Sequence, residues 1–465
     1  MNTELKGSPE GHSALRGKLR GETIEPGDAL YDQARKLFNA MIDKKPAVIA
    51  RCVDAADVIT CVNYAGEKGM LLAIRGGGHN GPGLGSCNDG LVIDLSSMRS
   101  VRVDPVAKTA QVAGGCVWRD VDRATHGFGL ATPSGIISST GVGGLTLGGG
   151  IGHLSRKYGL TIDNLLSVDM VLADGNFVTA NNEQNQDLFW AVRGGGGNFG
   201  VATSFTFRLH PVDTVVAGPM FWALEDAPAV MKAYEQFITD APEEINGFFA
   251  FLTVPPVDLF PAALHMRKVC GVIWCSLAGE ERTREILKPA ERWAKPLLSG
   301  IGTMPFPVLQ TLFDDLYSPG LQWYWKADFV DHLSDDAIAL HVKHGSRMPT
   351  LHSAMHLYPI NGAVQRAAEV DTAFSYRKTK WAEVIVGVDP DPANKGKITD
   401  WAKGYWDALH PYSAPGAYVN FMMEEGAARV EATYGTNYAR LRQVKAKYDA
   451  GNLFRVNQNI APADH

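Results

Sequence analysis

Apolar and polar positions along residues 46–211 form short alternating runs that glycine-rich loops interrupt. The run at 47–53 predicts a strand, and Asp54 after it is typical of an N-cap that opens an amphipathic helix at about 55–69. The run at 167–180 predicts a hairpin, because Asp-Gly in its middle is a turn signal. These runs favour an α+β fold with irregular loops over a regular βαβ array.

The amino-acid composition changes after about residue 212, where glycines become less frequent and aromatic residues more frequent. Amphipathic runs at 227–242 and 280–298 predict helices, and they alternate with apolar runs such as 247–254 and 380–388 that predict strands. We therefore expect an antiparallel sheet with helices beside it. Beyond residue 411, the pattern predicts a strand at 416–422 followed by a helix at 437–451.

Composition and charge exclude several classes of protein. The 465 residues carry 44 Lys+Arg against 50 Asp+Glu, a net charge of −6, which gives no global reason to bind nucleic acid or anionic membrane. No apolar stretch has the length of a spanning helix, and the polar N-terminus has no apolar core of a signal peptide. Six cysteines without a Cys-x-x-Cys pair favour a reduced, cytoplasmic protein with buried thiols and no metal site.

Three glycine loops carry the candidate chemistry, at 75–80, 138–144 and 148–152. Consecutive glycines let backbone N–H groups approach phosphate oxygens, and two such loops about 60 residues apart fit a pyrophosphate held from both sides. The single strand–loop–helix fingerprint of a Rossmann site is absent from this context. The alternative is that the glycines form tight turns of a packed sheet. His79, directly after three glycines, can reach the same ligand, although a lone loop histidine is usually structural or exposed.

The motifs in these loops resemble those of FAD-linked oxidases of the vanillyl-alcohol-oxidase type, in the berberine-bridge-enzyme branch. The resemblance covers about residues 40–212 and 417–462. The matching motifs are R-G-G-G-H at 75–79, G-V-G-G-L-T-L-G-G-G-I-G at 141–152, R-K-Y-G-L-T-I-D-N at 156–164, L-F-W-A-V-R-G-G-G-G-N-F-G-V at 188–201, Y-V-N-F at 418–421, Y-G-T-N-Y at 434–438 and K-Y-D-A-G-N-L-F-R-V-N-Q-N-I at 447–460.

The resemblance implies an α+β protein: a PCMH-type FAD-binding domain of two α/β subdomains, plus a substrate domain with an antiparallel sheet backed by helices. The expected parts are an N-terminal extension with a first helix (1–40), the FAD-binding domain (41–211), the substrate-binding domain (212–410) and a C-terminal segment that returns to the FAD domain (411–465).

The resemblance also implies a set of FAD contacts, with His79 bonded to the 8α-methyl carbon of the flavin. The implied contacts are Arg75, Gly76, Gly77, Gly78, His79, Asn80, Gly85, Ser139, Thr140, Gly141, Gly143, Gly144, Gly149, Gly152, His153, Asn164, Gly200, Val201, Asn457 and Asn459. Many members attach the flavin a second time, through a cysteine four residues before the second loop. Ile137 stands at that position, and Cys116 is expected to be a buried thiol. We therefore expect one covalent link, as in bacterial members that resemble 6-hydroxy-D-nicotine oxidase.

The catalytic candidates are less well defined. Sugar-oxidising members carry a second tyrosine where this chain has Phe421, and strand alternation would put Tyr418 on the opposite face from residue 421. An amine, or a substrate served by another base, therefore becomes more plausible than an oligosaccharide. Glu383 interrupts an apolar strand and would suit a general base if it faces the flavin, because burial would raise its pKa. The alternative is that it lies at a sheet edge.

Lys326 lies in a strand that reaches the substrate in relatives, and its alternative role is a salt bridge with Asp328 or another acid. His356 and Tyr358 are weaker candidates, expected in the core or at the rim. Thr140 matches the family position that governs oxygen access, where leucine blocks oxygen and a smaller residue admits it. It therefore predicts oxidase behaviour, with an oxygenase left open.

The leading hypothesis is an FAD-linked oxidase with two partners, a small organic molecule (an amine, an alcohol, a phenolic or a secondary metabolite) and O2, which yields H2O2. The alternatives are an oligosaccharide or polyol oxidase, a dehydrogenase with an organic acceptor, an oxygenase, a non-catalytic flavoprotein and, remotely, a nicotinamide dehydrogenase.

Overall fold

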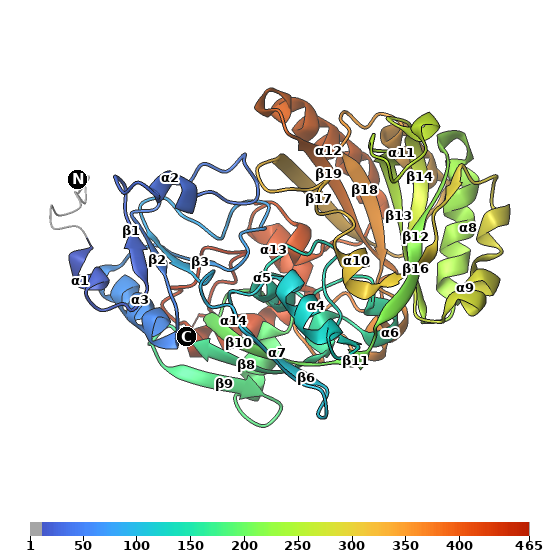
Figure 1. Ribbon diagram of the computed structural model, residues 1–465. Coiled ribbons are helices and arrows are strands. Elements are labelled where there is room, and N and C mark those ends of the chain that lie inside the picture. The colour runs from blue at the N-terminus through green and yellow to red at the C-terminus, as the bar shows by residue number, and fades with distance from the viewer. Residues whose placement is uncertain (1–11, 465) are drawn as a thin grey trace.

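The computed structural model describes residues 12–464, and most of the strands in this range belong to three main sheets (Figure 1). The predicted fold class, a PCMH-type FAD-binding fold combined with an antiparallel sheet backed by helices, is confirmed. The polar residues 1–11, at the start of the predicted extension, lie outside the described residues. No helix in the described range 12–464 has the length and apolar character needed to cross a membrane.

The first sheet has four strands in the order β1-β2-β4-β3, of which β2, β4 and β3 are parallel. The helix α3 follows β2 as predicted: the carboxylate of Asp54 accepts a hydrogen bond from the Asp57 N–H at 3.0 Å, and Gly69 ends the helix in a left-handed conformation. The elements are α1 (Ser13–Arg16), β1 (Glu22–Ile24), α2 (Tyr31–Ala34), β2 (Val48–Arg51), α3 (Ala55–Lys68), β3 (Leu72–Arg75) and β4 (Leu91–Asp94).

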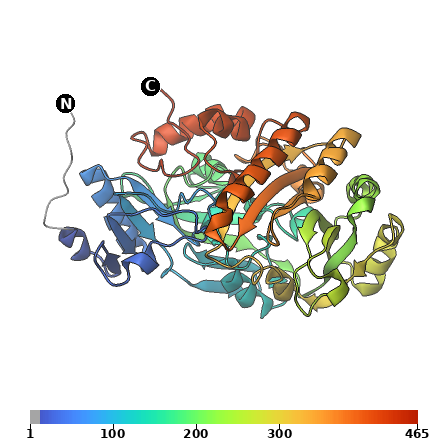
Figure 2. The same cartoon turned by 90° about the horizontal axis from the view of Figure 1, so that it is seen from above.

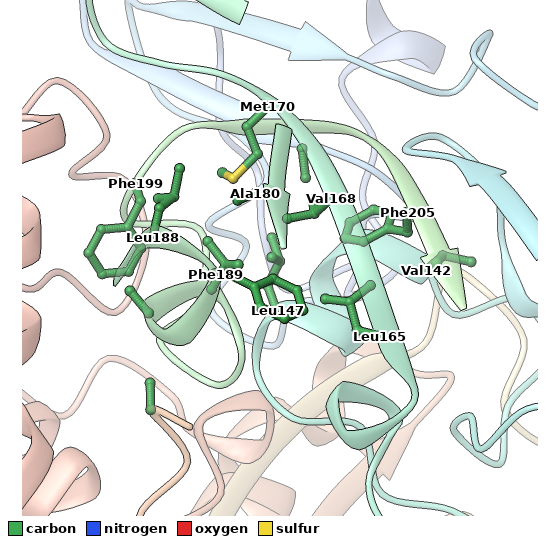
Figure 3. Packing of buried hydrophobic residues seen from close by; sticks show 14 of the residues in the cluster. Val142, Leu147, Leu165, Val168, Met170, Ala180, Leu188, Phe189, Phe199 and Phe205 are labelled. Atoms are coloured by element: carbon green, nitrogen blue, oxygen red, sulfur yellow. The ribbon is translucent and has the colours of Figure 1, made fainter. Parts of the chain in front are cut away.

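The second sheet is antiparallel, in the order β5-β6-β10-β8-β9. The predicted hairpin is the β8–β9 pair, and Gly175 adopts a φ of 78° in its turn, a value that favours glycine. Figure 3 shows Phe189 of α7, Val168 of β8 and Phe205 of β10 within one core. The elements are β5 (Val101–Asp104), β6 (Thr109–Ala113), α4 (Trp118–His126), β7 (Leu130–Ala131), α5 (Val142–Leu147), α6 (Ser155–Tyr158), β8 (Leu165–Val171), β9 (Phe177–Asn181), α7 (Gln186–Val192), β10 (Val201–Arg208) and β11 (His210–Pro211).

The third sheet is antiparallel, in the order β15-β12-β14-β13-β18-β19-β17, and β16 pairs with β12. Helices α8, α9, α11 and α12 lie on its outer side in Figure 1. Its other face turns toward the first two sheets, so alternate residues of each strand face either the helices or the interior. The elements are β12 (Thr214–Ala223), α8 (Ala227–Asp240), β13 (Ile245–Thr253), β14 (Lys268–Ser276), α9 (Glu280–Leu287), β15 (Leu298–Ser299), β16 (Gly302–Pro305), α10 (Phe306–Gln310), β17 (Gln322–Val330), α11 (Asp335–Gly345), β18 (Ala354–Pro359), β19 (Trp381–Asp389) and α12 (Lys395–Leu409).

The C-terminal segment returns to the N-terminal half, and Figure 2 shows its helices beside that half. It contains α13 (Ala427–Tyr434) and α14 (Tyr438–Tyr448), and α14 packs against α7. The strand predicted at 416–422 is wrong. Residues Val419–Phe421 form a 3₁₀ turn, in which the Phe421 N–H donates to the Tyr418 carbonyl at 2.8 Å. The Asn420 amide donates to the Leu145 carbonyl at 3.1 Å, so a tertiary contact replaces the strand pairing that the local pattern favoured.

Candidate active site

A cavity of about 340 Å³ lies where the three sheets meet. Of the sequence-predicted cofactor residues, it is lined by Arg75, Gly76, Gly77, Gly78, His79, Asn80, Gly85, Thr140, Gly141, Gly143, Gly144, Gly200 and Asn457. The loop at 75–80 follows β3, the segment 140–144 leads into α5, and Asn457 comes from the C-terminal tail. Segments far apart in the sequence therefore meet around one space, as the paired-loop hypothesis requires.

Two of the glycine loops touch through their backbones. A Cβ atom on Gly77 would lie 2.4 Å from the Gly141 nitrogen, and one on Gly141 would lie 2.3 Å from the Gly77 nitrogen. Only glycine permits this approach at either position. At the start of the first loop, the Arg75 guanidinium donates to the buried Asp94 carboxylate on the adjacent strand at 2.8 Å. This pair fixes the point at which the strand gives way to the loop.

His79 is half-buried at the wall of the cavity, between two partners. Its ring stacks on Phe38 with centroids 3.9 Å apart, and its Nε2 atom lies 3.0 Å from the Ser139 hydroxyl. Burial lowers the pKa of His79 to about 4, so the ring is neutral at neutral pH. The contact with Ser139 occupies one ring nitrogen and leaves Nδ1 without a described partner. Phe38 comes from the segment before residue 41, where no motif indicated a site residue.

The remaining donors fit a long ligand with anionic and polar groups. Positions Gly144 and Gly197 line the cavity, and a Cβ atom on either would meet no described atom within 4 Å, so their backbones are open to the cavity. The Nη1 atom of Arg75 and the Oδ1 atom of Asn457 are buried without a hydrogen-bond partner among the described residues. Open backbone, an unpaired guanidinium nitrogen and an unpaired amide oxygen suit a dinucleotide such as FAD.

Several predicted cofactor residues do not line the cavity. They are Ser139, whose hydroxyl contacts His79, together with Gly149, Gly152, His153, Asn164, Val201 and Asn459. Asn164 instead holds its own loop, donating to the carbonyls of Tyr158 and Leu160 at 2.9 Å each. Gly152 is needed for packing, because a Cβ atom there would lie 1.7 Å from the Ser134 carbonyl oxygen.

A chain of neighbouring aromatic rings, which we call the aromatic wall, runs beside the cavity, and all of its members except Phe248 and Phe313 line the cavity. It begins at the His79 ring and ends at Tyr418. Successive ring centroids are separated by 3.9 Å (His79–Phe38), 5.3 Å (Phe38–Trp323), 5.3 Å (Trp323–Tyr317), 6.3 Å (Tyr317–Phe313), 6.0 Å (Phe313–Phe248), 4.9 Å (Phe248–Tyr358), 5.7 Å (Tyr358–Phe421) and 4.8 Å (Phe421–Tyr418). Such a surface favours planar, apolar ligands.

Sequence reasoning placed His356 and Tyr358 in the core or at the rim, and the structure places both in the cavity wall. They occupy the same face of β18, and the His356 Nδ1 atom lies 2.8 Å from the Tyr358 hydroxyl. Burial lowers the pKa of His356 to about 4 and raises that of Tyr358 well above 10. Trp323 and Trp325, two residues apart on β17, were missed as well, although strand alternation gives them a common face.

The placement of Glu383 in the flavin-facing wall is wrong. Its neighbours on β19, Val384 and Val386, line the cavity, whereas Glu383 points to the helix side, where its Oε1 atom lies 3.9 Å from the Nδ1 atom of His341. The Oε1 atom has no hydrogen-bond partner among the described residues. Burial and the neighbouring Asp328 carboxylate raise the pKa of Glu383 well above 4.5. A shift of one residue reverses the face of a strand, which is why sequence alone misplaced this side chain.

Lys326 is also on the helix side, so its expected place at the substrate is wrong. Its ammonium group donates to the Glu425 carboxylate at 2.7 Å and lies 4.1 Å from the centre of the Trp406 ring. The alternative of a salt bridge is confirmed, with Glu425 as the acid instead of Asp328.

The argument from alternation at Tyr418 is wrong, because a 3₁₀ turn replaces the strand. In such a turn residues i and i+3 share a face, and Tyr418 and Phe421 both line the cavity. The Tyr418 oxygen accepts hydrogen bonds from the Gly150 N–H at 2.8 Å and the Asn420 amide at 2.7 Å. Burial nevertheless raises the pKa of Tyr418 to about 12.

Thr140 and Ile137 both line the cavity. Cys116 is not among the described residues that line it; its Sγ atom is buried and lies 3.4 Å from the Ser100 carbonyl oxygen. Burial raises the pKa of that thiol to about 11. No group of three or more metal-ligating side chains occurs among residues 12–464.

Comparisons with known proteins match this geometry. A family model described as an FAD binding domain matches residues 46–181, and one described as berberine and berberine-like matches residues 417–461. An FAD-linked oxidoreductase of Dictyostelium discoideum is 32% identical over 449 residues, 96% of this chain and 95% of the relative. The (R)-6-hydroxynicotine oxidase of Paenarthrobacter nicotinovorans is 37% identical over 206 residues, 44% of this chain and 45% of that protein.

A solved structure of 6-hydroxy-D-nicotine oxidase from Arthrobacter nicotinovorans shares the fold, with a TM-score of 0.85 and 24% identity over 96% of this chain and 98% of that chain. The sequence identities and the shared fold agree with the motifs and the cavity. The protein is therefore an enzyme of the berberine-bridge-like family of FAD-linked oxidoreductases.

Proposed function

We propose that this enzyme is an oxidase that holds FAD covalently through His79 and oxidises a small, uncharged organic molecule with O2 as the acceptor. The observation that carries the proposal is the setting of His79. The neutral ring stacks on Phe38 and is held at Nε2 by Ser139, so Nδ1 is the nitrogen left to form a bond. When bound, FAD supplies the oxidising group, taking a hydride from a substrate C–H bond and passing the electrons to O2 to give H2O2.

The residues of the chain divide the remaining tasks. The glycine loops and Asn457 bind the cofactor, and the aromatic wall excludes water and orients a planar substrate. The Tyr418 oxygen accepts two hydrogen bonds, which occupy both of its lone pairs. Tyr418 can therefore act toward a substrate atom only as a hydrogen-bond donor. Thr140 lines the cavity with a small side chain, which supports access of O2. Ile137 in place of the family's cysteine supports a single covalent link.

The substrate is proposed to be uncharged when bound. Of the residues that the structure describes, those lining the cavity include no aspartate, glutamate or lysine, and Arg75 is already paired with Asp94. A charged substrate would lack a counter-ion there, and a group without one is costly to bury. The same aromatic lining disfavours the oligosaccharide alternative, because a sugar needs several hydrogen-bonding partners.

The first experiment precipitates the purified enzyme in acid and measures flavin in the pellet and in the supernatant. Wild type and Cys116→Ala should retain flavin in the pellet, whereas His79→Ala should release it. The matched control is His153→Ala, because His153 is a buried histidine whose pKa is likewise lowered to about 4, yet it does not line the cavity. Retention of flavin by His79→Ala would refute the histidyl link. Peroxide detection during a screen of uncharged aromatic alcohols and amines then tests the oxidase proposal.

A further inference from the structure

The substrate side of the cavity needs a proton acceptor if the substrate is an alcohol, and the usual groups are absent from it. The carboxylates of Asp328 and Glu383 lie on the helix side of the large sheet, and Lys326 is paired with Glu425. The ionisable side chains among the described residues that line the cavity are Arg75, His79, Tyr317, His356, Tyr358, Tyr418 and Tyr434.

Most of these side chains cannot take up a proton. Arg75 is a permanent cation that donates to Asp94, and His79 is engaged by Ser139. The Tyr418 oxygen already accepts two hydrogen bonds, which leaves it only as a donor. Tyr317 and Tyr434 have no hydrogen-bonded base among the described residues to which they could pass a proton.

The His356–Tyr358 pair has the missing property. Both side chains point from β18 into the cavity, and His356 Nδ1 lies 2.8 Å from the Tyr358 hydroxyl. A neutral imidazole has one donor and one acceptor nitrogen. If Tyr358 donates to Nδ1, the tyrosine oxygen is left to accept; if Nδ1 donates to Tyr358, Nε2 is left to accept. In either tautomer the pair has room for one proton, and burial keeps His356 neutral at neutral pH.

The surroundings of the pair define what can approach it. Phe421, which lines the cavity, lies 5.7 Å from Tyr358, and Phe248 packs against both rings without lining the cavity, at 5.1 Å from His356 and 4.9 Å from Tyr358. Tyr317 is the nearby ionisable group that acts on Tyr358. A hydroxyl group that reaches His356 and Tyr358 therefore has to be carried on a flat, apolar body that fits along the aromatic wall.

We propose that His356 and Tyr358 together accept the proton of a substrate hydroxyl group and that the cavity takes an uncharged aromatic alcohol. The substrate O–H bond breaks and its proton passes to His356, either directly at Nε2 or through Tyr358, whose own proton moves to Nδ1. The hydrogen on the carbinol carbon leaves as hydride to the FAD of the proposed function, and the carbon–oxygen double bond forms. His356 ends as the imidazolium, and the released product is an aromatic aldehyde or ketone.

The test uses 4-nitrophenol as a probe that cannot be turned over. It carries a hydroxyl on a planar ring, has no carbinol hydrogen and turns yellow on ionisation. The purified holoenzyme is titrated with it at a pH below the solution pKa of the probe, and the difference spectrum gives the ionised fraction of the bound probe. The imidazolium of His356 and the bound phenolate stabilise each other, so we expect wild type to hold a larger ionised fraction of the bound probe than His356→Gln does. His356→Gln should lower the ratio of ionised to neutral bound probe by about tenfold or more, since tenfold corresponds to one pKa unit.

The control is His352→Gln, the same substitution four residues earlier, at a histidine that does not line the cavity. It should bind and ionise the probe as wild type does. Tyr358→Phe should reduce ionisation as strongly as His356→Gln if the proton passes through Tyr358, and less strongly if Nε2 takes it directly; both results support the pair. The proposal is overturned if wild type does not bind 4-nitrophenol, if it binds only the neutral form, or if His356→Gln ionises the probe as wild type does.

This inference rests on the proposed function only for the fate of the hydride. Flavin retention and peroxide are measured on the same samples, so a failure of the histidyl link or of the oxidase reaction is recorded separately from the ionisation of the bound probe.

Discussion

The contact between the two glycine loops gives a quantitative prediction for Gly77→Ala. The added methyl group would lie 2.4 Å from the Gly141 nitrogen, 2.6 Å from its Cα atom and 3.3 Å from the Ser139 carbonyl oxygen. The first two distances are about 1 Å shorter than an ordinary van der Waals contact. All three neighbours are backbone atoms, so no side chain can rotate away and one loop has to move by about that amount.

Overpacking of this kind costs about 1–3 kcal/mol, and for a domain of 150–250 residues each kcal/mol lowers the melting temperature by about 2–4 °C. Gly77→Ala is therefore expected to melt about 2–12 °C below wild type. The moving loop also carries His79, and a displacement of about 1 Å can slow a reaction by about 100-fold, so covalent flavin incorporation should slow by up to that factor.

The assay is a thermal melt followed by acid precipitation of the flavin, with Gly404→Ala as the control. Gly404 lies within α12, and a Cβ atom there would meet no described atom within 4 Å. Because alanine is the better helix former by about 1 kcal/mol, the control should melt at or above the wild-type temperature and retain its flavin. If Gly77→Ala melts at the same temperature as wild type and retains the same fraction of flavin, the two loops do not meet as described.

The other predictions concern four buried or cavity-lining side chains. Glu383→Gln should leave kcat and KM unchanged in steady-state assays, because Glu383 faces the helices. A tenfold fall in kcat would contradict this and make Glu383 a candidate general base again. Thr140→Leu should slow flavin reoxidation by O2 while leaving flavin reduction by substrate unchanged, which stopped-flow measurement of the two half-reactions would separate. Burial raises the pKa of Asp122 from 3.8 to about 7, so between these pH values the folded state keeps a proton that the unfolded state loses. The stability of the fold should therefore fall as the pH rises from about 4 to about 7. Asp122→Asn should remove this pH dependence of the melting temperature. Lys445→Met leaves the Asp449 carboxylate buried without the ammonium that donates to it at 2.6 Å, and should cost about 3–5 kcal/mol in denaturant unfolding. The further change Asp449→Leu should not restore that stability, because Asp449 also accepts hydrogen bonds from the Leu453 and Phe454 N–H groups.

The sequence predicted well wherever the signal was local. Asp54 begins a helix because its side chain caps the first turn, and Asp-Gly turns the β8–β9 hairpin because glycine accepts a positive φ. The loops at 75–80 and 138–144 and His79 were found because their motifs lie within a few residues of one another, whereas the third loop, at 148–152, contributes Ile151 to the cavity lining but none of its glycines. Such features depend on neighbours in the chain, so a pattern of residues is enough to identify them.

The errors concern the backbone conformation of one segment and the direction in which side chains face in the assembled protein. Glu383 was misplaced because one residue of register decides the face of a strand. Tyr418 was misjudged because Asn420 holds its segment in a 3₁₀ turn by bonding to the Leu145 carbonyl, about 275 residues away in sequence. His356 was undervalued because the aromatic wall around it is assembled from separate strands and loops, and no local pattern records that assembly.

The return of the C-terminal segment to the cavity also determines the order of two events, the synthesis of that segment and the binding of the cofactor. The Lys445 ammonium donates to the carbonyls of Asn198 and Phe454 at 2.6 and 3.0 Å, and Asn457 completes the cavity wall. Synthesis proceeds from the N-terminus, so His79 emerges from the ribosome long before these residues exist. Until then one side of the cavity lacks its wall and admits water. Capture of the cofactor should therefore be a late event that follows completion of the C-terminal helices. A chain stalled on the ribosome before these helices are made should carry no flavin.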